Sequence, residues 1–214
     1  MPKLCSVFLV YILMGTQLTY AQIGATLEDL PVSPKKNFDK GYSNVYLFDH
    51  GFFIDALLHY VHEHTLYQSK SYNIARGASV GISIGNKWYF SRSKFYRPGI
   101  ALIWAKTHLA LVNDDFGMPL ARLIFSPLNL GFVQVLRFND ETGLELNLFA
   151  GFNGLAMLDS SLFMLGYVIQ PELKFRYKKL SIGFNFCYFS SDSPSVANLQ
   201  QESLLLGLSI GSKF

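Results

Sequence analysis

The chain has 214 residues and a formal net charge of +3; 50% of its residues are hydrophobic, 15% are aromatic and 15% are charged. Because disorder requires low hydrophobicity and high charge, and soluble domains average about 25% charged residues, this composition excludes a disordered chain and points to a membrane. The 18 basic and 15 acidic residues form no basic cluster, which argues against a nucleic-acid partner. The two cysteines, Cys5 and Cys187, exclude a disulfide framework and a cysteine-based metal site.

The first 22 residues have the three-part layout of a secretory signal peptide. Lys3 gives a positive start, Val7 to Met14 is an unbroken apolar run, and small residues precede a cleavage point after Ala21. A membrane anchor is the alternative, but the apolar run is far shorter than the roughly 20 residues of a spanning helix. We therefore predict an exported chain whose mature part keeps one cysteine.

Residues 22–40 contain Pro31 and Pro34 and show no periodicity, so we expect a periplasmic leader, with a short lumen plug as the alternative. From residue 41 to 214, segments alternate apolar residues with small or polar ones, most clearly from Leu204 to Phe214. No later stretch has the length of a transmembrane helix, and a closed β-barrel is the other structure that spans lipid. We predict an all-β fold, a transmembrane up-and-down antiparallel barrel.

Eight strands are expected, at roughly 43–60, 74–90, 95–111, 120–138, 143–157, 163–176, 179–190 and 202–214. Short turns would follow the second, fourth and sixth strands, whereas longer loops would span 61–73, 112–119, 158–162 and 191–201, as in outer-membrane barrels. Pro171 lies inside the sixth strand and predicts a bulge or local break. Aromatic residues gather at the short-turn ends, as expected at a lipid headgroup level: Trp88, Phe90, Phe95, Tyr96, Phe138, Phe175, Tyr177 and Phe214.

Alternation does not say which face meets lipid. With lipid outside, the inward face carries charges of both signs, which we expect to pair because an unpaired buried charge is costly. We interpret this set as a plug in a narrow lumen, and a selectivity ring for small ions is the alternative. The predicted lumen charge network consists of Arg137, Glu145, Glu172, Lys174, Arg176 and Lys213. If the protein is soluble, the faces reverse and a lipocalin-like periplasmic carrier is expected instead.

A histidine-rich segment, His59 to His64, spans the end of the first expected strand and the start of the expected 61–73 loop. No metal site is predicted, but His59, His62 and His64 are the candidates, since alternate strand residues point the same way and imidazole binds divalent metals. The same loop, with Tyr67 and Lys70, is the expected contact for an extracellular ligand. A serine near a loop (Ser69, Ser71, Ser160 or Ser161), a histidine and Asp114 or Asp115 give a second hypothesis, a lipid A-modifying enzyme.

Over about residues 41–214 the chain resembles small, porin-like outer-membrane barrels of the eight-stranded OmpA and OmpX kind, and the resemblance rests on the C-terminal segment. The terminal pattern Leu206, Leu208, Ile210 and Phe214 looks like the signal read by the barrel-assembly machinery, although Ser212 departs from it. The Ala21–Gln22 cut resembles signal peptides common in the Bacteroidota. The resemblance implies the outer membrane of a Gram-negative-type bacterium, with membrane lipid and the assembly machinery as partners, but it implies no particular activity. We expect no cofactor and no enzymatic activity. A structural or surface-interaction role is expected, with a small-solute porin as the alternative.

Overall fold

The computed structural model describes residues 50–214 except 69, 91–94, 140 and 161. The predicted signal peptide, the cleavage point at Ala21, the leader at 22–40 and the beginning of the predicted first strand lie outside the described residues. In this part of the chain, no helix has the length and apolar character needed to cross a membrane.

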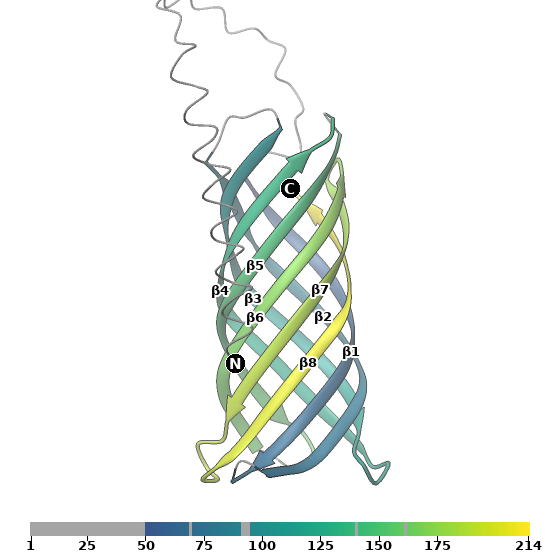
Figure 1. Ribbon diagram of the computed structural model, residues 1–214, viewed down its shortest axis with the longest axis vertical. Coiled ribbons are helices and arrows are strands. Elements are labelled where there is room, and N and C mark those ends of the chain that lie inside the picture. The colour runs from purple at the N-terminus through teal and green to yellow at the C-terminus, as the bar shows by residue number, and fades with distance from the viewer. Residues whose placement is uncertain (1–49, 69, 91–94, 140, 161) are drawn as a thin grey trace, which may run out of the picture. The chain divides into compact units, whose positions relative to one another are not determined.

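Eight antiparallel strands form one closed barrel, in which each strand pairs with the next and β8 pairs with β1 (Figure 1). The all-β class and the strand number are therefore as the alternation predicts. The strands are β1 (Gly51–Tyr67), β2 (Lys70–Tyr89), β3 (Tyr96–Asn113), β4 (Pro119–Arg137), β5 (Thr142–Met157), β6 (Leu162–Tyr177), β7 (Leu180–Asp192) and β8 (Leu199–Lys213).

The register makes the strands strongly tilted, as Figure 1 shows. A path of paired residues that starts at Phe53 and passes once through all eight strands returns to β1 at Glu63, ten residues further on. In a barrel of eight strands such a stagger leaves an interior just wide enough for side chains to fill. The contents of the lumen therefore decide what the barrel can do.

The strands alternate between an apolar outer face and an inner face that holds the charged residues. On β8, for example, Leu206, Leu208 and Ile210 are exposed on the outside, while Ser209 and Lys213 are buried inside. The same division holds on β7, where Ile182 and Phe184 are exposed and Ser181 and Asn185 are buried. This is the arrangement expected when lipid lies outside, and the reverse of a carrier with an apolar cavity and a polar outer face.

The two ends of the barrel can be told apart by the chain termini. Gly51 and Phe214 lie together, because the amide of Phe214 donates to the carbonyl of Phe52 over 2.8 Å. We call this the terminal end, and the opposite end, which holds the turns of β1–β2, β3–β4, β5–β6 and β7–β8, the distal end. Most of the predicted aromatic set is exposed near the terminal end, but Tyr96 is buried.

The expected difference in loop length is wrong. The predicted 61–73 loop is part of a long hairpin, since β1 continues to Tyr67 and β2 begins at Lys70. The other distal turns occupy only 114–118, 158–161 and 193–198, while the terminal end has turns at 90–95, 138–141 and 178–179. Polar residues such as His62 and His64 suggested a loop, but the strands carry them outward near the distal end.

Two strands contain the irregularities that proline imposes on a sheet. In β4, the register with β5 shifts between Phe125 and Asn129, and Leu128, which follows Pro127, has a positive φ of 58°. In β6, pairing with β7 is interrupted between Ile169 and Glu172 while the register stays the same. Pro171 therefore causes the predicted local break without a bulge, because it lacks the N–H that the ladder requires.

Candidate functional site: the filled lumen

A network of ion pairs fills the lumen near the terminal end. Both Lys87 and Arg176 pair with the buried carboxylate of Glu145. The ammonium of Lys174 lies 2.7 Å from Asp55 Oδ2 and 3.1 Å from Glu172 Oε2. Each carboxylate thus has a cation beside it, which offsets the cost of removing charges from water. We call these six residues the lumen charge network.

The network contains most of the residues that the sequence analysis placed in the lumen. Glu145, Glu172, Lys174 and Arg176 are its members, and Lys213 is buried nearby with its ammonium 5.2 Å from the ring centroid of Tyr89. Arg137 is only half-buried at the mouth, and its Nε donates to the carbonyl of Asn139 in the β4–β5 turn over 2.8 Å.

Among the described residues, five buried charges were missed by the sequence analysis: Asp55, Glu63, Lys87, Lys106 and Arg122. Lys87 continues the inward alternation of β2 by one step beyond Gly85, so the pattern itself contained the signal. Lys106 follows a register shift between β2 and β3 that leaves Trp104 without a partner and reverses the alternation after it. Asp55 lies on a strand that is apolar on both faces, where alternation alone is ambiguous.

Amide side chains extend the network toward the middle of the barrel. Asn147 Nδ2 donates to Glu145 over 2.7 Å and to Glu172 over 3.1 Å, and Gln170 also donates to Glu172. The ammonium of Lys106 donates to Gln170 and lies 3.1 Å from the Sγ of Cys187. Charged and amide groups therefore form one connected set across the lumen, and such a set rigidifies a core when its members are satisfied.

Two buried histidines lie in the middle of the lumen, on the distal side of this set. The rings of His59 and His108 are 5.0 Å apart between centroids and meet edge to face, and His59 is hydrogen-bonded to Asn185. Glycines on neighbouring strands make room for both rings, because a Cβ on Gly81 would overlap His108 and one on Gly207 would overlap His59. The middle of the lumen is thus also occupied by side chains.

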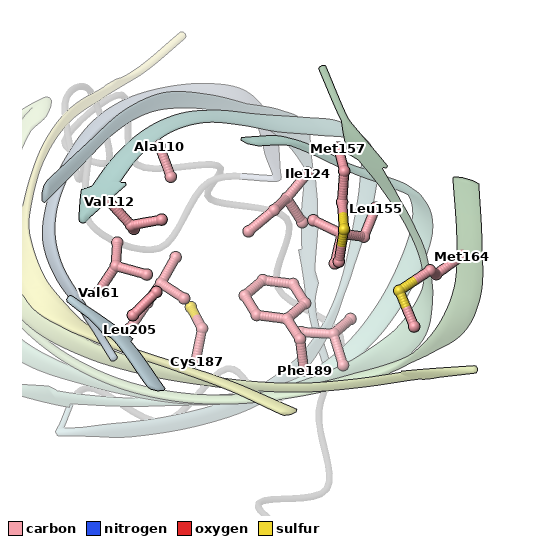
Figure 2. Packing of buried hydrophobic residues seen from close by; sticks show 12 residues of the cluster. Val61, Ala110, Val112, Ile124, Leu155, Met157, Met164, Cys187, Phe189 and Leu205 are labelled. Atoms are coloured by element: carbon pink, nitrogen blue, oxygen red, sulfur yellow. The ribbon is translucent and has the colours of Figure 1, made fainter. Parts of the chain in front are cut away.

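An apolar cluster closes the lumen toward the distal end. All eight strands contribute to it, and Figure 2 shows its side chains directed into the space that the ribbons enclose. Its buried members touch one another across the barrel, so this layer excludes water. They are Val61, Ala75, Ala110, Val112, Ile124, Leu155, Met157, Met164, Val168, Cys187, Phe189 and Leu205.

A second, smaller polar group covers the apolar cluster at the distal mouth. Arg122 Nη1 lies 2.5 Å from Asp159, and its Nε lies 3.5 Å from Glu63. Gln201 donates to Glu63 over 3.2 Å and accepts from Thr65 over 2.6 Å. The lumen is therefore filled along its length, with charges near the terminal end, apolar groups toward the distal end and a polar cap.

The three candidate metal ligands do not come together. His59 faces the lumen, whereas His62 and His64 face outward, with their Nε2 atoms 3.0 Å apart. Because successive strand residues point to opposite faces, the sheet lies between His59 and the other two. Across the described residues, no group of three or more His, Cys, Asp or Glu side chains has the arrangement of a metal site.

The described residues also keep the candidate catalytic groups apart. Among them, His59 bonds to Asn185, His62 and His64 bond to one another, and His50 accepts from the amide of Tyr89. Both ring nitrogens of His108 lack a hydrogen-bond partner, and no described histidine bonds to a serine hydroxyl. Asp114 instead holds the β3–β4 turn, since its Oδ1 accepts from the amides of Phe116 and Met118 over 2.9 and 2.8 Å. Ser69 and Ser161 lie outside the described residues.

The comparisons with known proteins yield structures of low sequence identity. No protein-family model and no curated protein matches the chain. The structure of Neisserial surface protein A matches with a TM-score of 0.47 and 15% identity over 78% of this chain and 99% of that one. The structure of the outer membrane protein OprG from Pseudomonas aeruginosa matches with a TM-score of 0.41 and 8% identity over 78% of this chain and 97% of that one. The structure of Ail, the attachment invasion locus protein of Yersinia pestis, matches with a TM-score of 0.33 and 12% identity over 75% of this chain and 98% of that one.

Proposed function

We propose that the protein is an integral outer-membrane β-barrel with a plugged lumen and a structural or surface-interaction role. The observation that carries the proposal is a closed barrel whose outer face exposes apolar side chains while its charges are buried inside. In lipid every backbone polar group needs an internal partner, and a closed barrel supplies these partners without a helix. An outer face this apolar in water would instead promote aggregation.

The direction of insertion follows from the termini. Both ends of the barrel chain lie at the terminal end, as an even strand number requires, and the predicted signal peptide would deliver the chain to the periplasm. We infer that the terminal end faces the periplasm of a Gram-negative-type bacterium and that the distal turns face outward. Leu206, Leu208 and Ile210 lie on the outer face of the last strand, and Phe214, which follows that strand, is also exposed, so an assembly machinery can read them.

A filled lumen favours a plug over the alternative, a small-solute or ion porin. The charge network, the His59 and His108 rings and the apolar cluster follow one another along the axis, so an ion would have to displace buried side chains at three levels. We expect no steady single-channel conductance from the refolded barrel in planar bilayers. Reproducible open steps that scale with salt concentration would overturn the plug and make the porin the better assignment.

The membrane location is tested by fractionation together with gel mobility of boiled and unboiled samples. We expect recovery in the outer membrane and a heat-dependent change in mobility, because a closed barrel resists detergent until it is heated. Recovery of a soluble periplasmic protein would contradict the proposal and favour the lipocalin-like carrier.

The surface-interaction part of the role is supported by the distal turns. Phe116 is 89% exposed at the tip of the β3–β4 turn and Met118 is also exposed, while Asp114 fixes the turn that presents them. A rigid turn presents apolar groups to a partner at low entropic cost. This turn is a further candidate contact for an extracellular ligand, beside the predicted segment with Tyr67 and Lys70.

We propose no enzymatic role, and the separation of serine, histidine and acid groups in the described residues supports this. The test is the mass spectrum of lipid A from cells that overproduce the protein, compared with cells that produce none. We expect identical spectra, and a mass change equal to one acyl chain would favour the lipid-modifying enzyme.

A further inference from the structure

Three basic side chains face outward together near the distal end. His62 and His64 lie on the outer face of β1, and Arg76 lies on the outer face of β2. We call these three residues the outer basic patch. The patch interrupts an outer face that is otherwise largely apolar, and it has no part in the lumen plug.

The spacing of these residues is unfavourable unless an anion is present. His62 and Arg76 are directly paired across β1 and β2, and the His62 and His64 rings are 4.9 Å apart between centroids. Side chains in directly opposed positions have Cβ atoms about 5 Å apart, and like charges placed there are destabilising. Two imidazoles and a guanidinium on adjacent strands therefore make a concentrated positive site when the imidazoles are protonated.

Two nearby carboxylates each accept a hydrogen bond from another group. Glu202 on β8 is paired in register with His64, but its Oε1 accepts a hydrogen bond from the hydroxyl of Tyr188 over 3.0 Å. Asp115 in the β3–β4 turn accepts from the amide of Ile74 over 3.1 Å. Among the described residues, no carboxylate forms an ion pair with Arg76.

The position along the barrel indicates which anion can reach the patch. Arg76 is paired with Asn113, the last residue of β3, so the patch is level with the point where that strand ends. On the side toward the middle of the barrel, Tyr60 and Leu111 are exposed and continue the apolar face. The patch thus lies at the distal edge of the apolar face, where lipid headgroups adjoin the acyl chains.

We propose that the outer basic patch binds the phosphate of a membrane lipid headgroup. Arg76 offers a planar pair of N–H donors that matches phosphate oxygens, and a ring N–H of His62 or His64 that is released from the hydrogen bond between the two imidazoles adds a donor to the same group. The apolar side chains of Tyr60 and Leu111 lie where the acyl chains of that lipid would run. The inference rests on the proposed membrane location, since only a barrel in lipid brings headgroups to this edge.

The test uses the complete mature barrel refolded in uncharged detergent micelles, and native mass spectrometry measures the occupancy of added lipid. Phosphatidic acid is the probe, and diacylglycerol, which has the same chains without the phosphate, is the matched lipid. We expect phosphatidic acid to bind at least about tenfold more tightly, because charge-assisted bonds form only with the phosphate. Equal occupancy by the two lipids would overturn the inference.

Variants assign the preference to the patch. Arg76→Gln and the double variant His62→Asn with His64→Asn should each remove most of the preference, and Arg76→Lys should retain part of it because the charge remains. Lys178→Gln, which removes a positive charge at the terminal end, is the matched control and should bind like the wild type. A preference that survives both patch variants would overturn the assignment.

Two further measurements distinguish a failure of this inference from a failure of the proposed function. Inorganic phosphate that displaces phosphatidic acid at equal concentration would show a site for free phosphate and overturn the lipid assignment. Every sample is also checked for heat-dependent gel mobility. A wild-type barrel without that shift contradicts the proposed function itself, whereas a normal shift without lipid preference contradicts only this inference.

Discussion

At the scale of single residues, Gly131 and Phe149 show how tightly the lumen is filled. The two residues are directly paired between β4 and β5, and the buried ring of Phe149 lies over Gly131. A Cβ at position 131 would overlap ring atoms of Phe149. The phenyl group can therefore occupy this layer only because the residue opposite has no side chain.

We expect Gly131→Ala to lower the free energy of unfolding by about 1–3 kcal/mol, because overpacking a filled core forces side chains from their preferred rotamers. Urea unfolding in micelles, followed by tryptophan fluorescence, measures the change. Gly154→Ala is the matched control, since its Cβ would lie 3.0 Å from the ring of Phe163, which is exposed on the outer face and free to move. Equal losses in the two variants would mean that Phe149 is not confined.

At the scale of strands, the lumen charge network joins elements that are distant in the sequence. Glu145 on β5 holds Lys87 on β2 and Arg176 on β6, so one carboxylate balances cations from two other strands. Removing the carboxylate leaves both cations buried near Lys174 without sufficient negative charge.

We expect Glu145→Gln to destabilise the barrel by about 3–5 kcal/mol, the usual cost of breaking a buried pair from one side. The ion pair between Glu141 and Lys178 is solvent-exposed, and its charged atoms lie 3.4 Å apart. Glu141→Gln should therefore cost less than about 1 kcal/mol. Urea midpoints of the two variants, compared with the wild type, check this difference. A small effect at both positions would indicate that water reaches the network.

The sequence predicts the strand number and most of the inward residues because the alternation has a period of two wherever one face meets the lumen. It fails where a strand breaks that period. Lys106 lies inward only because the unpaired Trp104 shifts the register of β3, and nothing in the local alternation marks that shift. The end of β1 and the beginning of β2 were missed because outward polar residues near a barrel rim have the same composition as the residues of a loop.

At the scale of the whole molecule, the outer face decides between a membrane barrel and a soluble one. Leu206 is the middle residue of β8 and is 57% exposed, whereas Leu180, 59% exposed, begins β7 at the terminal end. The two leucines are equally accessible to solvent but differ in their expected depth in a bilayer.

We expect Leu206→Lys to destabilise the barrel in lipid vesicles by about 2–4 kcal/mol and Leu180→Lys by only about 0–1 kcal/mol, since the cost of a lysine on the lipid face depends on depth. Denaturant unfolding in vesicles of phosphatidylcholine measures both. Equal and small effects would contradict a lipid-facing wall.

The ion pairs that fill the lumen could not be predicted from the sequence. Pairing across the barrel depends on the stagger of ten residues in the closed register and not on residues that are neighbours in the sequence. The alternation places Glu145 and Lys174 on the inner face, but it does not bring Lys87 or Asp55 to them. The closed register does so, by setting residues from β1, β2, β5 and β6 at one level.

The buried Cys187 gives the barrel an internal reporter. Its thiol is 0% exposed in the apolar cluster, and it is the single cysteine that remains if the chain is cut after Ala21. A water-soluble alkylating reagent can therefore modify the native protein only when the packed layers around the thiol separate. The labelling rate, followed over hours at several temperatures, would measure how often the interior of the folded barrel becomes open to solvent.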